Sequence, residues 1–158
     1  MSEAPGEPTE GVFAVDSAYL DCAVQTGVAG GRVISLSFPD TPDAEADDDH
    51  PLLDRIEAYL EGVEDDFTDV EVALTVPTEQ RAVLDAVRGV PYGRQVSVER
   101  LTRLAAGLDA GDDEDRATVR RALAGNPVPL VISDHRVRDG PSAAPPRVEQ
   151  RLRDIEEL

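Results

Sequence analysis

The hydrophobic residues of this chain change their spacing part-way along it, and this change most constrains the fold. Between Tyr19 and Phe38, apolar residues alternate with polar or small ones as in half-buried β-strands, and a glycine-rich segment at 27–31 interrupts the alternation. From Thr78 onward, apolar residues recur every three or four positions, as on one face of an α-helix. We therefore predict a β-hairpin in the first half and a mainly helical second half.

Apolar spacing and capping residues predict further elements. Pro51 suits the first turn of a helix, and Ser97 suits the cap of another. The alternation from Val70 to Leu74 predicts a short strand. The expected helices cover residues 51–61, 78–88, 97–106 and 147–157, and one more follows the acidic run at 112–115 and ends at 123. A loop is expected at 133–146, after a short apolar segment at 128–132.

Charge is distributed unevenly between the two halves. All 15 basic residues are arginine, and 33 acidic residues bring the formal net charge to -18. Residues 1–77 hold two arginines and nineteen acids, a net charge of −17, whereas residues 78–158 hold thirteen arginines and fourteen acids, a net charge of −1. The overall excess predicts a halophilic source, because concentrated salt screens self-repulsion within about 3 Å at 1 M. The asymmetry favours a polyanionic partner, although arginines on solvated helix faces paired with nearby acids would give the same count.

Several classes of protein are excluded by the composition. No apolar run reaches the roughly 18–20 residues that cross a bilayer, and the acidic start lacks the apolar core of a secretory signal. Cys22 is the sole cysteine, so it forms no internal disulfide, and with two histidines the chain has too few ligands for the usual zinc cage. Cys22 falls on the apolar face of the predicted hairpin, as a small buried residue. We expect a cytoplasmic monomer with no membrane partner, bound metal or cofactor.

Two consecutive helices with a glycine-containing connection fit a helix-turn-helix. The second of them displays Arg116, Arg120 and Arg121, of which the first two share a face and the third lies beside it. Arginines on such a helix can reach the phosphates or base edges of duplex DNA. Many helical domains share this spacing, so it is compatible with double-stranded DNA as a partner without being specific for it.

Several short motifs follow one another in an order that resembles a known family. They are Val-Pro-Tyr-Gly at 90–93, Val-Ser at 96–97, Ala-Leu-Ala-Gly-Asn-Pro-Val-Pro at 122–129 and His-Arg-Val at 135–137. This order is similar to that of the O6-alkylguanine-DNA alkyltransferases, also called methylated-DNA–protein-cysteine methyltransferases. The similarity covers residues 50–158, including His-Pro-Leu-Leu at 50–53.

The resemblance implies a fold of the α/β plus α class. After an acidic disordered tail at 1–10, it places a small ribonuclease-H-like α/β domain at 11–76 and a winged helix-turn-helix domain at 77–158. Proteins of this family bind DNA through the minor groove, flip the damaged guanine out of the stack and move its alkyl group onto a buried cysteine.

The acceptor motif of the family departs from its usual form here. Pro-Cys-His-Arg-Val is replaced by Ser-Asp-His-Arg-Val at 133–137, so that Asp134 stands at the acceptor position. A thiolate beside a histidine is a strong nucleophile at an alkyl carbon, whereas a carboxylate is far weaker. Cysteine alkylation at this position is therefore excluded. Transfer to Asp134 as an ester, with hydrolysis allowing turnover, stays open as an alternative.

The resemblance carries the rest of the family's site onto three further residues. Asn126 matches the asparagine of the hinge, His135 the histidine that activates sulfur through water, and Glu156 the glutamate that orients this histidine. Together with Asp134 they form the expected catalytic group, in which two carboxylates near one imidazole would favour its protonated form. An inert buried network of ion pairs would use the same residues.

Other positions of the DNA-binding half also depart from the family. Val98 takes the place of a tyrosine that helps to rotate the target phosphate, and Ala117 that of the arginine that fills the gap left by the flipped base, with Arg116 one residue away. The segment 140–146 is rich in proline and lacks the aromatic residues of the family's pocket loop. The residues expected to contact DNA are Arg94, Ser97, Arg116, Arg120, Arg121 and Arg136.

Three hypotheses for function follow. The leading one is a DNA-binding, alkyltransferase-like protein of DNA repair that recognises DNA, including O6-alkylguanine DNA, without cysteine alkyl transfer, and passes the lesion to a repair-protein partner. The alternative is a methyltransferase-family enzyme with altered or residual transfer activity at Asp134 or Cys22. A second alternative is a scaffold that no longer binds DNA. Whether the chain is an enzyme stays open at this point.

Overall fold

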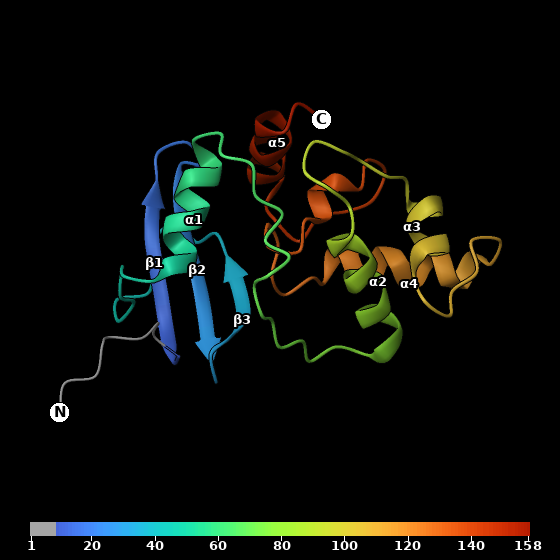
Figure 1. The fold of residues 1–158 in the computed structure, drawn as a ribbon, viewed down its shortest axis with the longest axis horizontal. Helices are drawn as coiled ribbons and strands as arrows, with labels where there is room; N and C mark the ends of the chain where they lie inside the picture. The colour runs from blue at the N-terminus through green and yellow to red at the C-terminus, as the bar shows by residue number, and fades with distance from the viewer. Residues whose placement is uncertain (1–8) are drawn as a thin grey trace.

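A computed structural model describes residues 9–158, so most of the predicted acidic tail lies outside the described residues. Three antiparallel strands, β1 (Gly11–Ser17), β2 (Cys22–Ala29) and β3 (Arg32–Ser37), form a sheet in the order β1-β2-β3. Figure 1 shows helix α1 (Pro51–Leu60) lying across one face of this sheet. Helices α2 (Thr78–Arg88), α3 (Val98–Leu104) and α4 (Asp113–Ala124) group together beyond β3. The molecule is thus an α/β protein whose strands all precede its helices.

The sheet differs from the predicted hairpin in three respects: it has an additional first strand, β2 begins later than expected, and the turn between β2 and β3 is shorter. Tyr19 lies in the turn between β1 and β2 rather than in a strand, and β1 was not predicted. The turn between β2 and β3 is shorter than expected and is made by Gly30 and Gly31, whose φ angles of 60° and 76° suit glycine. Residues 27–29 belong to β2, where a bulge at Gly27 and Val28 accommodates the break in the alternation.

The predicted strand at 70–74 is wrong. Val72 makes a single bridge to Val33, whose amide donates to the Glu71 carbonyl oxygen at 2.9 Å. Carbonyl groups just before Glu71 do not pair with a strand. The Arg88 guanidinium donates to the carbonyl oxygens of Phe67 at 2.9 Å and Val70 at 2.7 Å. These carbonyl groups serve a side chain of α2 instead of a strand partner.

The helices agree well with the prediction, and their ends follow from capping. The Ser97 hydroxyl accepts a hydrogen bond from the Arg100 amide at 3.1 Å and starts α3, which ends at Leu104, two residues before the expected end. Helix α4 begins inside the acidic run, because the Asp112 carboxylate accepts a hydrogen bond from the Glu114 amide at 2.8 Å. Helix α5 (Pro146–Ile155) starts one residue earlier than predicted.

The segment between α4 and α5 is more ordered and more buried than a loop. It contains a short 3-10 helix, η1 (Asp134–Arg136), and every residue from 128 to 137 is buried. One continuous hydrophobic cluster joins the sheet, α1 and the later helices. The amide of Leu36 in β3 also donates to the Pro127 carbonyl oxygen at 2.9 Å. Both halves of the sequence therefore contribute to one core, and η1 lies within it.

Within residues 9–158, no helix is both long enough and apolar enough to cross a lipid bilayer.

Candidate functional site

The candidate site is a group of buried polar side chains around η1. Asp134, His135 and Arg136 are each at most 1% exposed, although all three side chains can carry charge. Buried ionisable groups are stable only when other groups supply hydrogen bonds or opposite charge. Their partners therefore define what the site can do.

Asp134 is held by three neutral donors. Its carboxylate accepts hydrogen bonds from Asn126 Nδ2 at 3.1 Å, Ser142 Oγ at 2.5 Å and the Ala143 amide at 2.9 Å. Burial raises the pKa of Asp134 above its usual range, because it outweighs the opposing effect of hydrogen bonds from Ser142 and Ala143. The carboxylate thus ties the segment after α4 to the proline-rich segment before α5.

Asn126, the residue expected as the asparagine of the hinge, lies just after α4. Besides its contact with Asp134, Nδ2 donates to the Ile132 carbonyl oxygen at 2.9 Å, and Oδ1 accepts from the Val128 amide at 3.0 Å. All three contacts are buried, so this side chain fixes the turn that leaves α4.

His135 belongs to a second hydrogen-bonded group. Its Nε2 atom lies 2.5 Å from Glu156 Oε2 and 3.3 Å from the Tyr59 hydroxyl, which itself donates to Glu156 Oε2 at 2.5 Å. Among the described residues, the buried Nδ1 atom has no hydrogen-bond partner. Of the two carboxylates near the imidazole, that of Glu156 is hydrogen-bonded to it, whereas the oxygens of Asp134 are bound to Asn126, Ser142 and Ala143.

Glu156 also neutralises a buried arginine. Arg136 Nε donates to Glu156 Oε1 at 2.8 Å, and its NH1 atom donates to Asp66 Oδ1 at 3.1 Å and to the Val90 carbonyl oxygen at 2.7 Å. Burial opposes the ionisation of Glu156, but hydrogen bonds and charge from His135 and Arg136 outweigh it and lower the pKa to about 2. Glu156 is therefore ionised at neutral pH.

The position of Arg136 corrects one expectation. This residue was expected to contact DNA, yet its side chain is 1% exposed and its guanidinium is bound to Glu156 and Asp66. A guanidinium in this position cannot reach a phosphate on the surface. Arg136 is a structural partner of Glu156 in this conformation.

The other residues expected to contact DNA lie nearer the surface. Arg94, Arg120 and Arg121 are exposed, and Ser97 is half-buried as the cap of α3. Arg116 is half-buried, and its guanidinium donates to the Ala110 carbonyl oxygen and to Asp113. Among the described residues, the guanidinium groups of Arg94 and Arg120 have no hydrogen-bond or ion-pair partner, whereas Arg121 donates to Thr118 Oγ1 at 3.0 Å and Arg116 is engaged locally.

The three places at which the motifs depart from the family pattern are Val98, Ala117 and the proline-rich segment 140–146, and they are buried to different extents. Val98 is 1% exposed, and its amide donates to Asp139 Oδ1 at 2.7 Å. Ala117 is half-buried on α4. Gly140 lies so close to Leu123 that an added Cβ would come within 2.7 Å of the leucine side chain. The proline-rich segment is therefore packed tightly against α3 and α4.

Three residues of the site were not predicted from the sequence: Tyr59, Asp66 and Ser142. Tyr59 is separated from Glu156 by 97 positions, and it was predictable only as part of the apolar stripe of α1. Burial and the nearby charge of Glu156 raise the pKa of Tyr59, so it acts as a hydrogen-bond donor.

Cys22 and possible metal ligands lie apart from this site. Cys22 is buried in β2, as predicted, and burial raises the pKa of its thiol. Within the described part of the chain, no three or more histidine, cysteine or acidic side chains are grouped closely enough to hold a metal ion. The functional groups around η1 are two buried carboxyl groups, one imidazole, one guanidinium and the hydroxyl groups of Tyr59 and Ser142.

Two curated relatives are similar in sequence to this chain. A methylated-DNA–protein-cysteine methyltransferase from Methanopyrus kandleri is 33% identical over 105 residues, which cover 66% of this chain and 75% of the relative. A protein of the same name from Methanothermobacter thermautotrophicus is 37% identical over 87 residues, which cover 54% of this chain and 46% of the relative. No family model matches the chain.

Solved structures show the same fold. Mycobacterium tuberculosis OGT in complex with DNA is similar with a TM-score of 0.68 and 22% identity, covering 93% of this chain and 91% of that one. An O6-methylguanine-DNA methyltransferase from Pyrococcus kodakaraensis is similar with a TM-score of 0.63 and 18% identity, and the match covers 93% of this chain and 98% of that one. The sequence relationship to the Methanopyrus protein, over three quarters of its length, decides the assignment. This chain belongs to the methylated-DNA–protein-cysteine methyltransferase family.

Proposed function

We propose that the chain is an alkyltransferase-like member of this family, which recognises DNA without moving an alkyl group onto a cysteine. The observation that carries the proposal is the state of Asp134, which stands at the acceptor position. This side chain is 1% exposed, and its two oxygens accept three hydrogen bonds from within the protein. Burial keeps a reacting carbon away from Asp134, and the three hydrogen bonds lower the nucleophilicity of its oxygens.

Cysteine chemistry has no support elsewhere in the chain. Cys22 lies in β2, and burial raises the pKa of its thiol, which disfavours the reactive thiolate. The contacts of Asp134 likewise give no support to ester formation. The alternative of altered transfer activity is therefore the weaker hypothesis.

The proposed DNA-binding unit is the second half of the chain. We infer the division suggested by the family, with a ribonuclease-H-like domain at 11–76 and a winged helix-turn-helix domain at 77–158. In this division α3 and α4 form the helix-turn-helix, and the exposed Arg94, Arg120 and Arg121 contact phosphates or bases. The similarity to an OGT bound to DNA supports the proposal, as does the concentration of arginines after residue 77.

Recognition of damage is the finer part of the proposal. We infer that O6-alkylguanine in duplex DNA is bound in preference to guanine, and that a separate repair protein acts on the lesion afterwards. The family-like turn at Asn126 and the His135–Glu156 pair persist although the acceptor is gone. Their retention fits a protein that has kept the architecture for reading DNA.

A duplex titration tests this function. The full chain is titrated with an O6-methylguanine duplex and with the same duplex carrying guanine, at several salt concentrations. We expect salt-dependent binding to both and tighter binding to the methylated duplex, because phosphate contacts release counterions. Equal and negligible affinity for both duplexes would refute DNA recognition and favour the scaffold hypothesis.

A further inference from the structure

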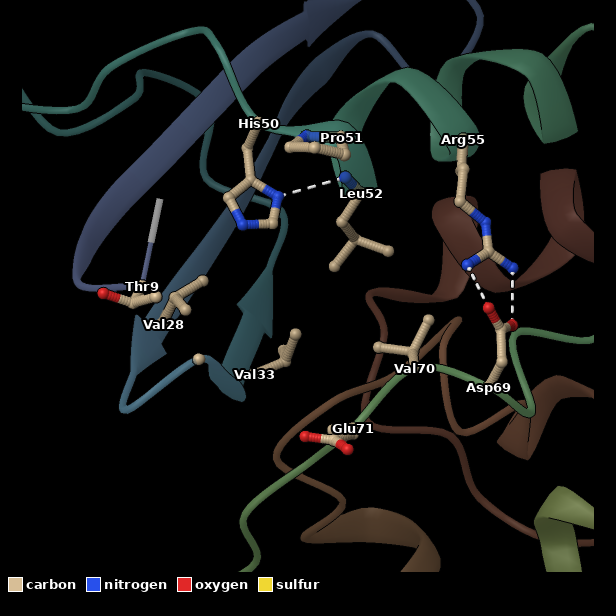
Figure 2. Close-up of a pocket in the computed structure, with 11 residues that line it drawn as sticks. Thr9, Val28, Val33, His50, Pro51, Leu52, Arg55, Asp69, Val70 and Glu71 are labelled. Carbon is tan, nitrogen blue, oxygen red and sulfur yellow. Dashed lines mark hydrogen bonds and ion pairs between the residues drawn. The ribbon is translucent and has the colours of Figure 1, made fainter. Parts of the chain in front are cut away.

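A cleft outside the candidate site opens between the β2–β3 turn, the start of α1 and the segment 69–71. Its volume is about 320 Å³, and Figure 2 shows His50 on one side and Glu71 on the other. Val28 and Val33 come from the sheet, and Val70 comes from the opposite wall. The cleft is therefore an apolar space between two polar groups.

His50 directs a hydrogen-bond donor toward this space. Its Nδ1 atom accepts a hydrogen bond from the Leu52 amide at 3.0 Å, so the neutral ring carries its proton on Nε2. The side chain belongs to a residue that is only 7% exposed, and its ring packs on Phe13 with centroids 4.8 Å apart. No described residue accepts a hydrogen bond from Nε2. In Figure 2 this nitrogen lies on the edge of the ring turned toward Val28. This nitrogen is not among the buried atoms that lack a partner, so it keeps contact with solvent at the cleft, and an acceptor on a ligand can replace the water there.

The charges around the cleft exclude an anion as the ligand. The Arg55 guanidinium is fully engaged, because it donates to both oxygens of Asp65 and to both oxygens of Asp69. Figure 2 shows the Arg55–Asp69 pair at the rim. The Glu71 carboxylate, by contrast, has no hydrogen bond or ion pair with any described residue. The free charge of the cleft is therefore negative.

We propose that this cleft binds a cationic group on an apolar chain, of the arginine or lysine type. The cation pairs with the Glu71 carboxylate, the methylene groups contact Val28, Val33 and Val70, and a carbonyl oxygen of the ligand accepts the hydrogen bond from His50 Nε2. Such a ligand satisfies the donor, the carboxylate and the apolar wall together. The site lies in the first half of the chain, and its occupancy does not depend on the proposed DNA-binding function.

The same chemistry can come from a free amino acid derivative or from a side chain of a peptide, and the probes separate these sources. The ¹⁵N-labelled full chain is titrated with Nα-acetyl-arginine N-methylamide and with the peptide acetyl-Val-Arg-Val-amide. Nα-acetyl-citrulline N-methylamide is the neutral isostere. Spectra are recorded near 1 M salt, where a Debye length of about 3 Å removes diffuse attraction to the acidic surface. We expect saturable shifts confined to the cleft with one or both arginine probes and none with citrulline. Binding of the peptide alone would identify a protein-borne group, whereas similar binding of both probes would show that the isolated derivative suffices.

Two variants remove the proposed contacts without removing the fold. His50→Asn keeps a good N-cap for α1 but lacks the Nε2 donor, and Glu71→Gln removes an exposed charge. Each is expected to weaken binding by about two- to tenfold, as for the loss of one hydrogen bond or ion pair. Glu57→Gln, an exposed change of the same kind on α1, should leave binding unaltered. No saturable binding of either arginine probe, equal binding of citrulline, or unchanged binding by both cleft variants would overturn the proposal.

Discussion

Asp134 and Glu156 are both buried carboxylates, yet their pKa values are shifted in opposite directions. Asp134 receives hydrogen bonds from an amide, a hydroxyl and a backbone N–H, so burial dominates and raises its pKa. Glu156 receives hydrogen bonds from Arg136 and His135, which overcome burial and lower its pKa to about 2. At the scale of single residues, the partners decide in which direction the pKa of each buried carboxyl is shifted.

The Asp134→Asn variant should become more stable relative to the wild-type chain as the pH rises. The oxygen of the new amide could accept from Asn126 and Ala143, while its nitrogen could donate to the Ser142 hydroxyl, so all contacts can be kept. Because the folded pKa of Asp134 is raised, the wild-type chain loses stability as the pH rises through that value. Chemical unfolding between acid and neutral pH should therefore show a growing advantage for Asp134→Asn. The Asp134→Ala control should lose about 1–3 kcal/mol by leaving buried donors unpaired. A constant difference between Asp134→Asn and wild type at every pH would contradict this interpretation.

Glu156→Gln should be strongly destabilising at neutral pH. It leaves the buried Arg136 guanidinium with the partly exposed Asp66 as its remaining carboxylate partner, and breaking a buried pair costs about 3–5 kcal/mol. Because the folded pKa of Glu156 is lowered, the wild-type advantage is present above the usual carboxyl range and is lost as the pH falls toward 2. Glu157→Gln makes the same charge change at an exposed neighbour and should have little effect in the same unfolding experiment. Equal stability of the two variants at neutral pH would show that the Arg136–Glu156 pair is unimportant.

The elements that the sequence predicted well are those with a local signal. Ser97 and Asp112 cap α3 and α4 through amide groups only two or three residues further along the chain. Neighbouring residues in the sequence were therefore sufficient to predict where these helices begin. Strand β1 was missed because two adjacent apolar residues, Phe13 and Ala14, are both buried and break the alternation. The segment expected as a strand at 70–74 makes a single bridge, from Val72 to Val33, and the Val70 carbonyl oxygen at its start accepts instead from the Arg88 side chain.

The residues of the candidate site likewise fall into those that the sequence motifs indicated and those that only tertiary packing brings in. Asn126 lies beside Asp134, and His135 lies beside Glu156, so the four residues that the motifs select are close together in the fold. The motifs could not reveal Tyr59 or Asp66, because these residues reach the site from the first half of the chain through tertiary packing. Nor could they show that Arg136 would be buried, since an arginine in a motif carries no signal of its exposure.

Helix α4 should contribute measurably to DNA affinity. Arg120 and Arg121 are exposed on it, and loss of one phosphate contact reduces the slope of log K against log salt by about 1. Arg120→Ala combined with Arg121→Ala should therefore weaken duplex binding and reduce its salt dependence. Arg32→Ala in β3 removes an exposed arginine far along the sequence from α4 and should have a smaller effect. If the double variant and Arg32→Ala have equal effects, α4 is not the DNA-contacting helix.

The whole molecule carries a formal net charge of -18, most of it in the first 77 residues. Such self-repulsion acts over the Debye length, which falls from about 10 Å at 0.1 M salt to about 3 Å at 1 M. The sheet and α1, which belong to this acidic first half, nevertheless share a core with the less charged helices. Stability of the complete chain should therefore depend on the solvent as well as on packing.

Salt should raise the midpoint of thermal unfolding. We expect an increase between 0.1 M and 1 M for sodium chloride and potassium chloride alike, because both screen the acidic surface. A neutral osmolyte at matched osmolality is the control and should stabilise less. A midpoint that stays constant across this range would refute the proposal of a protein adapted to concentrated salt.

The fate of the methyl group tests the central claim most directly. An O6-methylguanine duplex is incubated with an excess of the full chain, and the methyl content of the recovered DNA and the intact mass of the protein are then measured. The burial and hydrogen bonding of Asp134 predict that the DNA keeps its methyl group and that the protein mass is unchanged. Stoichiometric loss of methyl groups from the DNA with a matching gain in protein mass, or catalytic loss without a gain, would contradict the account.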